Sequence, residues 1–214
     1  MKLTDEESAL FYSVWMPLLY GVNVKHNFSP RFPKPNPKLV KPVHSDQALP
    51  IRDKIWDEPQ LIDEFLADPE LCSFNEAERK IVLDIRAHFL KETFILTEHL
   101  PKYSVMMMTT GDEESTRLYG VLGLGYSIKA SVLIPPPVLV TTVLLPFQGK
   151  IIYDGMGRFT PHQFTEKELD AIFAIYRATK RRFGIFESLN SHSVAPLERK
   201  KKSAVSRKKT KRRR

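Results

Sequence analysis

The chain has 214 residues, 42% of them hydrophobic, which is enough apolar material for one folded domain and excludes a wholly disordered chain. Its net charge of +8 is unevenly distributed: residues 198–214 hold eleven Lys and Arg against one Glu, which leaves 22 bases and 24 acids in residues 1–197. Cys72 is the only cysteine, which excludes an intrachain disulfide and a zinc site built from several cysteines and favours a reducing compartment.

The sequence predicts neither an export signal nor a membrane span. Asp5, Glu6 and Glu7 stand where a secretory signal needs a basic residue and then an apolar run. Residues 130–149 carry no formal charge and are long enough to cross a bilayer. However, Pro135–Pro137 would leave carbonyl groups without donors in lipid, so we expect a loop followed by a buried strand. These features predict a cytoplasmic protein without a membrane partner, or a nuclear one if the source cell has a nucleus.

The N-terminal part is predicted to be a helix followed by an extended arm. Thr4 and Glu7 have the spacing of a capping box, and apolar residues recur at helical intervals to about Tyr20, with Pro17 expected to kink or end the helix. Residues 1–28 therefore form the first predicted unit. Residues 29–45 contain five prolines among basic residues, a composition typical of a polyproline-type arm.

Residues 46–197 are predicted to form an α+β core domain. Two short helices open at Pro50 and Pro59, and a longer one runs from a capping box at Ser73 and Glu76 to about Lys91. Strand-like runs follow, at residues 93–100, 102–109, 116–122, 138–147, 150–153 and 158–160. Short turns favour antiparallel neighbours, so we expect an antiparallel meander sheet or a small, partly open barrel packed against helices.

A last helix is predicted between a capping box at Thr165 and Glu168 and a stop at Gly184. One face of it is apolar and is expected to pack on the sheet. The other carries a basic stripe near the C-terminal end, where cations also suit the helix dipole: Arg177, Lys180, Arg181 and Arg182.

Common catalytic signatures are absent from the sequence. It contains no Walker glycine loop, HExxH, GxSxG or paired-cysteine motif, and we identify no cofactor, metal site or small-molecule substrate. Gly120, Gly123 and Gly125 reverse the dinucleotide spacing and are expected to serve close backbone packing. Glu98, His99 and Asp154 are the weak catalytic candidates, because they stand at strand ends or turns where side chains can converge on a cleft.

The run from Val143 to Gly155, LLPFQGKIIYDG within it, together with Tyr119–Leu124, resembles a motif pair of uncharacterised bacterial proteins. The resemblance covers roughly residues 49–189 and implies a bacterial cytoplasmic protein, with no activity attached. From the residues alone, the motif indicates two strands joined by a turn at Gln148–Gly149 and followed by a tight turn at Asp154–Gly155.

Residues 198–214 are predicted to be a disordered polybasic tail. Nothing apolar enough to pack interrupts the charge, and a flexible cation of this kind binds polyanions. We therefore expect non-specific binding of nucleic acid, RNA before DNA, through the backbone only, because the tail lacks aromatic residues for base stacking. The binding residues are Arg199, Lys200, Lys201, Lys202, Arg207, Lys208, Lys209, Lys211, Arg212, Arg213 and Arg214.

Three alternatives stay open. The chain is either a non-catalytic accessory protein that binds nucleic acid, an enzyme with a site near Glu98, His99 and Asp154, or a protein-interaction module that uses a sheet edge or the arm at 29–42. A solubilising tail without a partner, a nuclear address and attraction to an anionic membrane surface are further explanations of the basic segment.

Overall fold

The computed structural model describes residues 1–35, 45–108 and 115–189. Most of the predicted Pro-rich arm and the whole of the polybasic segment lie outside these residues. The described part confirms the α+β class. Its helices are α1 (Asp5–His26), α2 (Ser45–Asp57), α3 (Gln60–Ala67), α4 (Glu76–His88), α5 (Ile128–Ser131) and α6 (Glu166–Phe183). Its strands are β1 (Leu90–His99), β2 (Ser104–Met108), β3 (Leu118–Leu122), β4 (Val138–Phe147), β5 (Lys150–Tyr153) and β6 (Arg158–Thr160).

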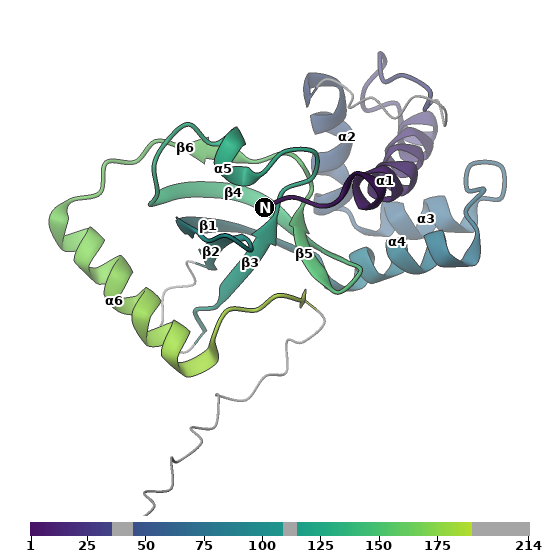
Figure 1. Cartoon of the computed structure of the whole chain (residues 1–214). Helices are drawn as coiled ribbons and strands as arrows, with labels where there is room; N and C mark the ends of the chain where they lie inside the picture. The colour runs from purple at the N-terminus through teal and green to yellow at the C-terminus, as the bar shows by residue number, and fades with distance from the viewer. Residues whose placement is uncertain (36–44, 109–114, 190–214) are drawn as a thin grey trace, which may run out of the picture.

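The six strands form one mixed, ring-like sheet (Figure 1). The order of pairing is β1-β2-β3-β5-β4-β6, and β1 also pairs with β4, so the pairings of the first five strands return to their starting point. β1 is long enough to pair with two strands. Its first half pairs with β4, its second half pairs with β2, and residues 94–96 pair with both. A shift in register between Leu96 and Glu98 accompanies the change of partner, as expected of a bulge.

The predicted antiparallel meander is wrong, because β5 lies between β3 and β4 and runs parallel to β3. The structure is a ring-like mixed sheet and not a barrel. Short turns correctly indicated the β1–β2 and β4–β5 hairpins. Turn length did not constrain the relative position of β3 and β4. The connection between them, residues 123–137 with α5, is long enough to cross the end of the ring.

Alternation along the strands divides the apolar side chains into three layers, as the period of two requires. One set fills the ring, including Phe94, Leu96, Val121, Val140 and Ile151. A second set faces helices α1 to α4: Val143, Leu145, Phe147 and Ile152. The third lies beneath α6: Ile95, Val105, Met107 and Leu118. The ring is therefore covered by helices on two sides.

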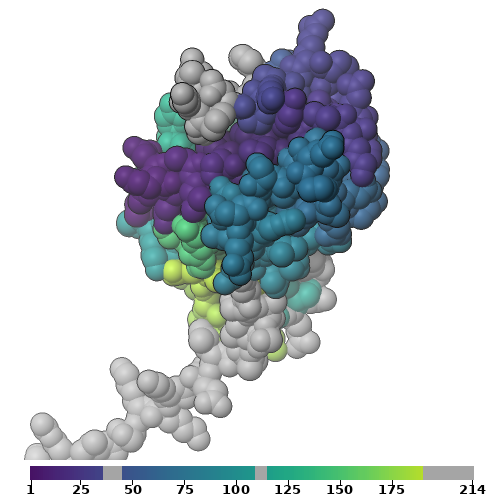
Figure 2. Space-filling model, turned by 90° about the vertical axis from the view of Figure 1, so that its right-hand side faces the viewer, coloured from purple at the N-terminus to yellow at the C-terminus, as the bar shows by residue number. Residues whose placement is uncertain are grey.

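The larger helical layer contains α1 to α4, and Figure 2 looks onto it, with α1 crossing above the later helices. Pro17 neither ends α1 nor limits it to residue 20, since the helix continues to His26. Buried side chains on both sides of the proline, such as Trp15 and Leu19, hold the two halves in one apolar cluster and outweigh the lost backbone hydrogen bond. The beginning of the predicted arm packs here too, because Asn23 donates to the Ser29 carbonyl at 2.8 Å and Phe32 is buried.

Two other helix starts differ from prediction. Pro50 lies inside α2, which already begins at Ser45. The capping box of α4 is Asn75 with Glu78 and not Ser73 with Glu76, because both pairs have the same spacing and only the geometry distinguishes them. The capping boxes of α1 and α6, Thr4 with Glu7 and Thr165 with Glu168, are as predicted.

Turns in the resembling motif adopt the expected backbone. Gln148 and Gly149 have φ values of 49° and 74°, which suit the β4–β5 hairpin, and Gly155 has a φ of 84° after Asp154. Across residues 1–35, 45–108 and 115–189, the helices include none with both the length and the apolar composition needed to span a membrane.

The glycines of the loop before α5 differ in their surroundings. A Cβ on Gly123 would lie 1.9 Å from the carbonyl oxygen of Tyr126, whereas a Cβ on Gly125 would meet nothing within 4 Å. Gly123 also exchanges backbone hydrogen bonds with the N-terminal segment, accepting from Leu3 at 2.9 Å. Close packing, as expected from the sequence, therefore applies to Gly123 and not to Gly125.

We predict that Gly123→Ala lowers the free energy of unfolding by about 1–3 kcal/mol, because a backbone oxygen cannot move aside as a flexible side chain can. Gly125→Ala is the matched control and should change it by less than about 0.5 kcal/mol. Urea unfolding followed by circular dichroism measures both. Equal effects of the two substitutions would contradict this account of the loop.

Candidate functional site

The structure does not bring the three predicted catalytic residues together. Glu98 faces α6, where its carboxylate accepts a hydrogen bond from the Tyr176 hydroxyl. The next residue, His99, ends β1 and contacts Ser104, its partner at the start of β2. Asp154 follows β5 and is completely buried beneath α2. A shared cleft, which the enzyme hypothesis required, is not formed by these side chains.

Asp154 is the centre of a buried polar network. Its Oδ2 accepts from Arg52 Nε at 2.5 Å and from Trp56 Nε1 at 2.9 Å, while Oδ1 accepts from the backbone N–H of Met156 at 3.2 Å. Arg52 is itself only 8% exposed, and it also donates to the Met156 carbonyl and to Asp53. The network thus connects α2 to the end of β5.

The charges in this network are mutually dependent. Complete burial raises the pKa of Asp154, and the Arg52 guanidinium and the Trp56 indole act against that increase. Burial also acts to lower the pKa of Arg52. The nearby carboxylates of Asp154 and Asp53 have a larger opposite effect, so the pKa of Arg52 is raised. Because each contact of the Asp154 carboxylate is with a donor, the ionised form is the one that this environment accommodates. The Asp154 side chain has no solvent-exposed surface, so we interpret this network as structural.

Sequence reasoning missed Arg52 and Trp56, although a signal was present. The two residues are four positions apart on one helix and share the apolar face of Ile51 and Ile55. A charged residue inside such a face needs a buried partner of opposite charge. Identifying Asp154 as that partner required the tertiary structure.

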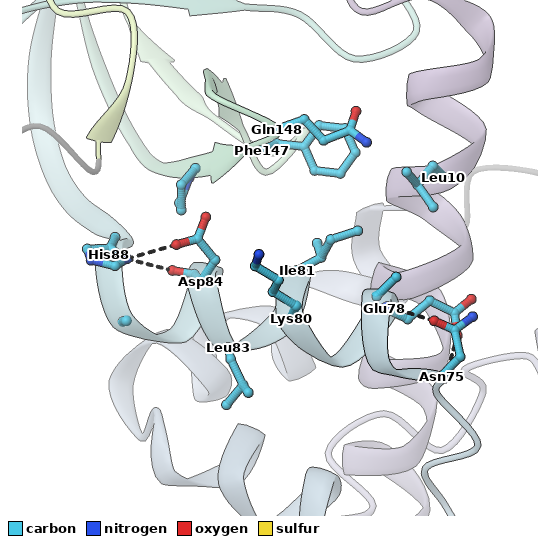
Figure 3. A pocket seen from close by; sticks show the side chains of 13 residues that line it. Leu10, Asn75, Glu78, Lys80, Ile81, Leu83, Asp84, His88, Phe147 and Gln148 are labelled. Atoms are coloured by element: carbon cyan, nitrogen blue, oxygen red, sulfur yellow. Dashed lines mark hydrogen bonds and ion pairs between the residues drawn. The ribbon is translucent and has the colours of Figure 1, made fainter.

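A groove of about 660 Å³ lies between α4 and the β4–β5 turn (Figure 3). Leu10, Ile81 and Phe147 provide an apolar floor, and at one end His88 Nδ1 lies 3.1 Å from a carboxylate oxygen of Asp84. The described lining contains no serine, threonine or cysteine. The His88–Asp84 pair therefore has no hydroxyl or thiol beside it to activate.

A basic surface covers the C-terminal turns of α6. Arg177 and Arg181 are exposed, are four positions apart, and form no ion pair within the described residues. The guanidinium carbons of Arg117 and Arg182 lie 4.0 and 4.9 Å from the centre of the Phe183 ring, which fixes both side chains beside them. Residues 171–184 contain no acid that could neutralise the surface locally.

Lys180, which the sequence placed in the same stripe, has a different role. Its Nζ lies 2.7 Å from the Tyr176 hydroxyl and 3.4 Å from Glu98 Oε1. Burial, and secondarily Glu98, raise the pKa of Tyr176, so the phenol stays protonated and donates to the carboxylate. Glu98 thus anchors α6 to β1. The cations left for an external partner are chiefly Arg177 and Arg181.

Metal binding has no geometric support in the described residues, where no three His, Cys, Asp or Glu side chains come together in a way that could hold an ion. The predicted nucleic-acid-binding residues at 199–214 lie outside the described part of the chain. Their role stays a prediction.

Comparisons with protein-family models, with curated proteins and with solved structures find no match to this chain. The resemblance of the Val143–Gly155 motif to uncharacterised bacterial proteins therefore stays a prediction.

We predict that Asp154→Ala lowers the free energy of unfolding by about 3–5 kcal/mol, because it leaves Arg52 buried without its partner. Replacing the pair together, Arg52→Met with Asp154→Leu, should recover much of this loss. Both are measured by urea unfolding.

Glu58→Ala, at the residue that follows α2, is the control, because its partner Lys54 is exposed and such pairs contribute less than about 1 kcal/mol. A loss no greater for Asp154→Ala than for Glu58→Ala would show that the buried network is not structural.

Proposed function

We propose that this protein binds nucleic acid without sequence preference, through a cationic surface in which the end of α6 continues into the polybasic segment. The observation that carries the proposal is that Arg177 and Arg181, on the helix that precedes this segment, are exposed and form no ion pair with any acid in residues 1–35, 45–108 and 115–189. α6 ends at Phe183, and the first base of the segment is Arg199. Both groups of cations therefore belong to one end of the chain.

Helix-dipole effects alone do not account for this surface. Cations in a last turn stabilise a helix by about 0.3–1 kcal/mol each, and Lys180, Arg181 and Arg182 already occupy that turn. Arg177 lies a full turn earlier, where the interaction with the helix end is weak. Its exposure beside Arg181 creates a pair of cations with the same orientation, a suitable arrangement for successive phosphates along a backbone.

The composition of the cationic surface favours backbone contacts over base reading. The polybasic segment has no aromatic residue, and Phe183 at the end of α6 is buried, so neither offers a ring for base stacking. Affinity should consequently come from the release of counterions, and RNA and DNA should both bind. A cytoplasmic accessory protein, bacterial if the motif resemblance holds, is the context that we propose, with RNA as the first ligand to test.

We predict that Arg177→Ala with Arg181→Ala weakens binding of a single-stranded RNA and lowers the slope of log affinity against log salt by about 1.4, since each lost phosphate contact removes about 0.7. Deleting residues 198–214 should lower the slope further. Fluorescence anisotropy over a series of salt concentrations measures both effects.

The matched control is Lys80→Ala with Lys167→Ala, which removes the same charge from exposed positions away from the end of α6. This pair should leave the slope unchanged. Equal RNA affinity of the full chain and of the chain without residues 198–214 at low salt would overturn the proposal. So would recovery of one stoichiometric protein partner after nuclease treatment together with loss of RNA binding, which would indicate an interaction module.

A further inference from the structure

A smaller pocket, of about 300 Å³, lies between the β1–β2 turn and α5, where the ring-like sheet meets the long β3–β4 connection. His99 and Ser104 line it from the sheet, and Ser127 and Lys129 line it from α5. These residues are brought together only by the fold, since they come from three segments of the chain. Neither Arg52–Asp154 nor the basic surface of α6 contributes to the lining.

The hydrogen bonding of this pocket determines what His99 presents to it. His99 and Ser104 face each other across the β1–β2 ladder, with Nδ1 and Oγ 2.8 Å apart. The Ser104 side chain is almost completely buried, and its hydroxyl proton needs an acceptor, for which Nδ1 is in place. With Ser104 as the donor to Nδ1, the proton of the neutral ring is on Nε2, which is then free to donate to a ligand.

Two further donors face the same space. Ser127 Oγ accepts from the backbone N–H of Ala130 at 3.2 Å, which leaves its hydroxyl proton to donate. Lys129 is exposed and forms no ion pair within the described part of the chain. An imidazole N–H, a hydroxyl and an ammonium group thus line one pocket, and its described lining contains no carboxylate.

The electrostatics agree with this geometry. Burial, and after it the charge of Lys129, lower the pKa of His99, and the α-amino group of Met1 acts in the same direction. The two charges that shift the pKa of His99, on Lys129 of α5 and on the N-terminal segment, are both positive, while Ser104 on β2 is neutral. A site of this kind lacks a counterion, and an external anion would supply it.

We propose that this pocket binds a phosphate-type oxyanion, either free or as the phosphate group of a small monoester. His99 Nε2, Ser127 Oγ and Lys129 Nζ are its donors, and Ser104 is a positioning residue that sets the tautomer of His99. A volume of about 300 Å³ is at the lower end of small-ligand sites and accommodates a phosphate with a small substituent. The site is additional to the proposed nucleic-acid surface and does not depend on it.

The test uses the full chain and the imidazole resonances in two-dimensional ¹H–¹⁵N spectra. His99 is assigned among the six histidines from the His99→Gln spectrum. Because a bound anion stabilises the imidazolium, inorganic phosphate should raise the pKa of His99 in a saturable manner, by about one unit for a tenfold preference for the charged ring. Lys129→Gln should reduce the phosphate affinity, and Lys80→Gln, on α4, is the control.

Each outcome decides the proposal. Absence of a saturable change at His99, or an identical response in Lys129→Gln, overturns it. A response to inorganic phosphate supports a free oxyanion, and tighter binding of ribose 5-phosphate supports a monoester. RNA affinity should be unchanged in Lys129→Gln, so a failure of this site and a failure of the nucleic-acid proposal are measured separately.

Discussion

The parallel pairing of β5 with β3 is the interaction on which the arrangement of the molecule depends. Two residue pairs, Val121 with Ile151 and Leu122 with Ile152, join the strands that complete the ring. Once β5 occupies this position, β1 to β5 each have a partner on both sides, and their alternate side chains fill a common interior. Closure also sends the β3–β4 connection over the end of the ring, where α5 meets the β1–β2 turn.

The buried Arg52–Asp154 pair connects this ring to the helical layer. Hydrophobic contacts between the two layers are non-directional and would tolerate several placements of α2. The Asp154 carboxylate accepts from groups on α2 and from its own turn, so it selects one placement. Such specificity is a better account of a buried ion pair than a large gain in stability, because desolvation of both charges offsets most of their attraction. In this molecule we interpret the Arg52–Asp154 pair as a contact that fixes the position of α2 relative to the sheet.

Charge outside the core follows another principle. Several described cations have an acid beside them, as Lys91 has Asp57 and Lys102 has Glu187, and are less available to external ligands. Among the described cations that form no ion pair with a described acid, two groups have a distinctive setting: Arg177 and Arg181 at the end of α6, and Lys129, which lines a pocket with His99. An extended polyanion fits the first group, which precedes the polybasic segment in the sequence, whereas a small anion fits the second, which lines a small pocket. The two proposals thus arise from cations in different geometric settings.

The sequence by itself determined the elements whose signals are local. Periodicity of two and of 3.6, capping-box spacing and turn glycines identified the strands β4 to β6 at their observed bounds, the caps of α1 and α6, and the α+β class. Local signals were insufficient where two candidates had equal spacing, as at Ser73 and Asn75, or where packing outweighed a proline, as at Pro17. They also located the excess of positive charge, because charge is a property of composition.

Tertiary structure alone decided which residues meet. Four features join segments that are far apart in the chain. They are the position of β5 between β3 and β4, the contact of Asp154 with Arg52, the hydrogen bond between Glu98 and α6, and the shared pocket of His99 and Lys129. Each of these contacts brings together two segments joined by a long stretch of chain. The entropic cost of forming such a loop depends only weakly on its length, so the length of a connection does not select a partner. Neighbouring residues therefore carry no signal for the partner that each strand or charged group finally selects.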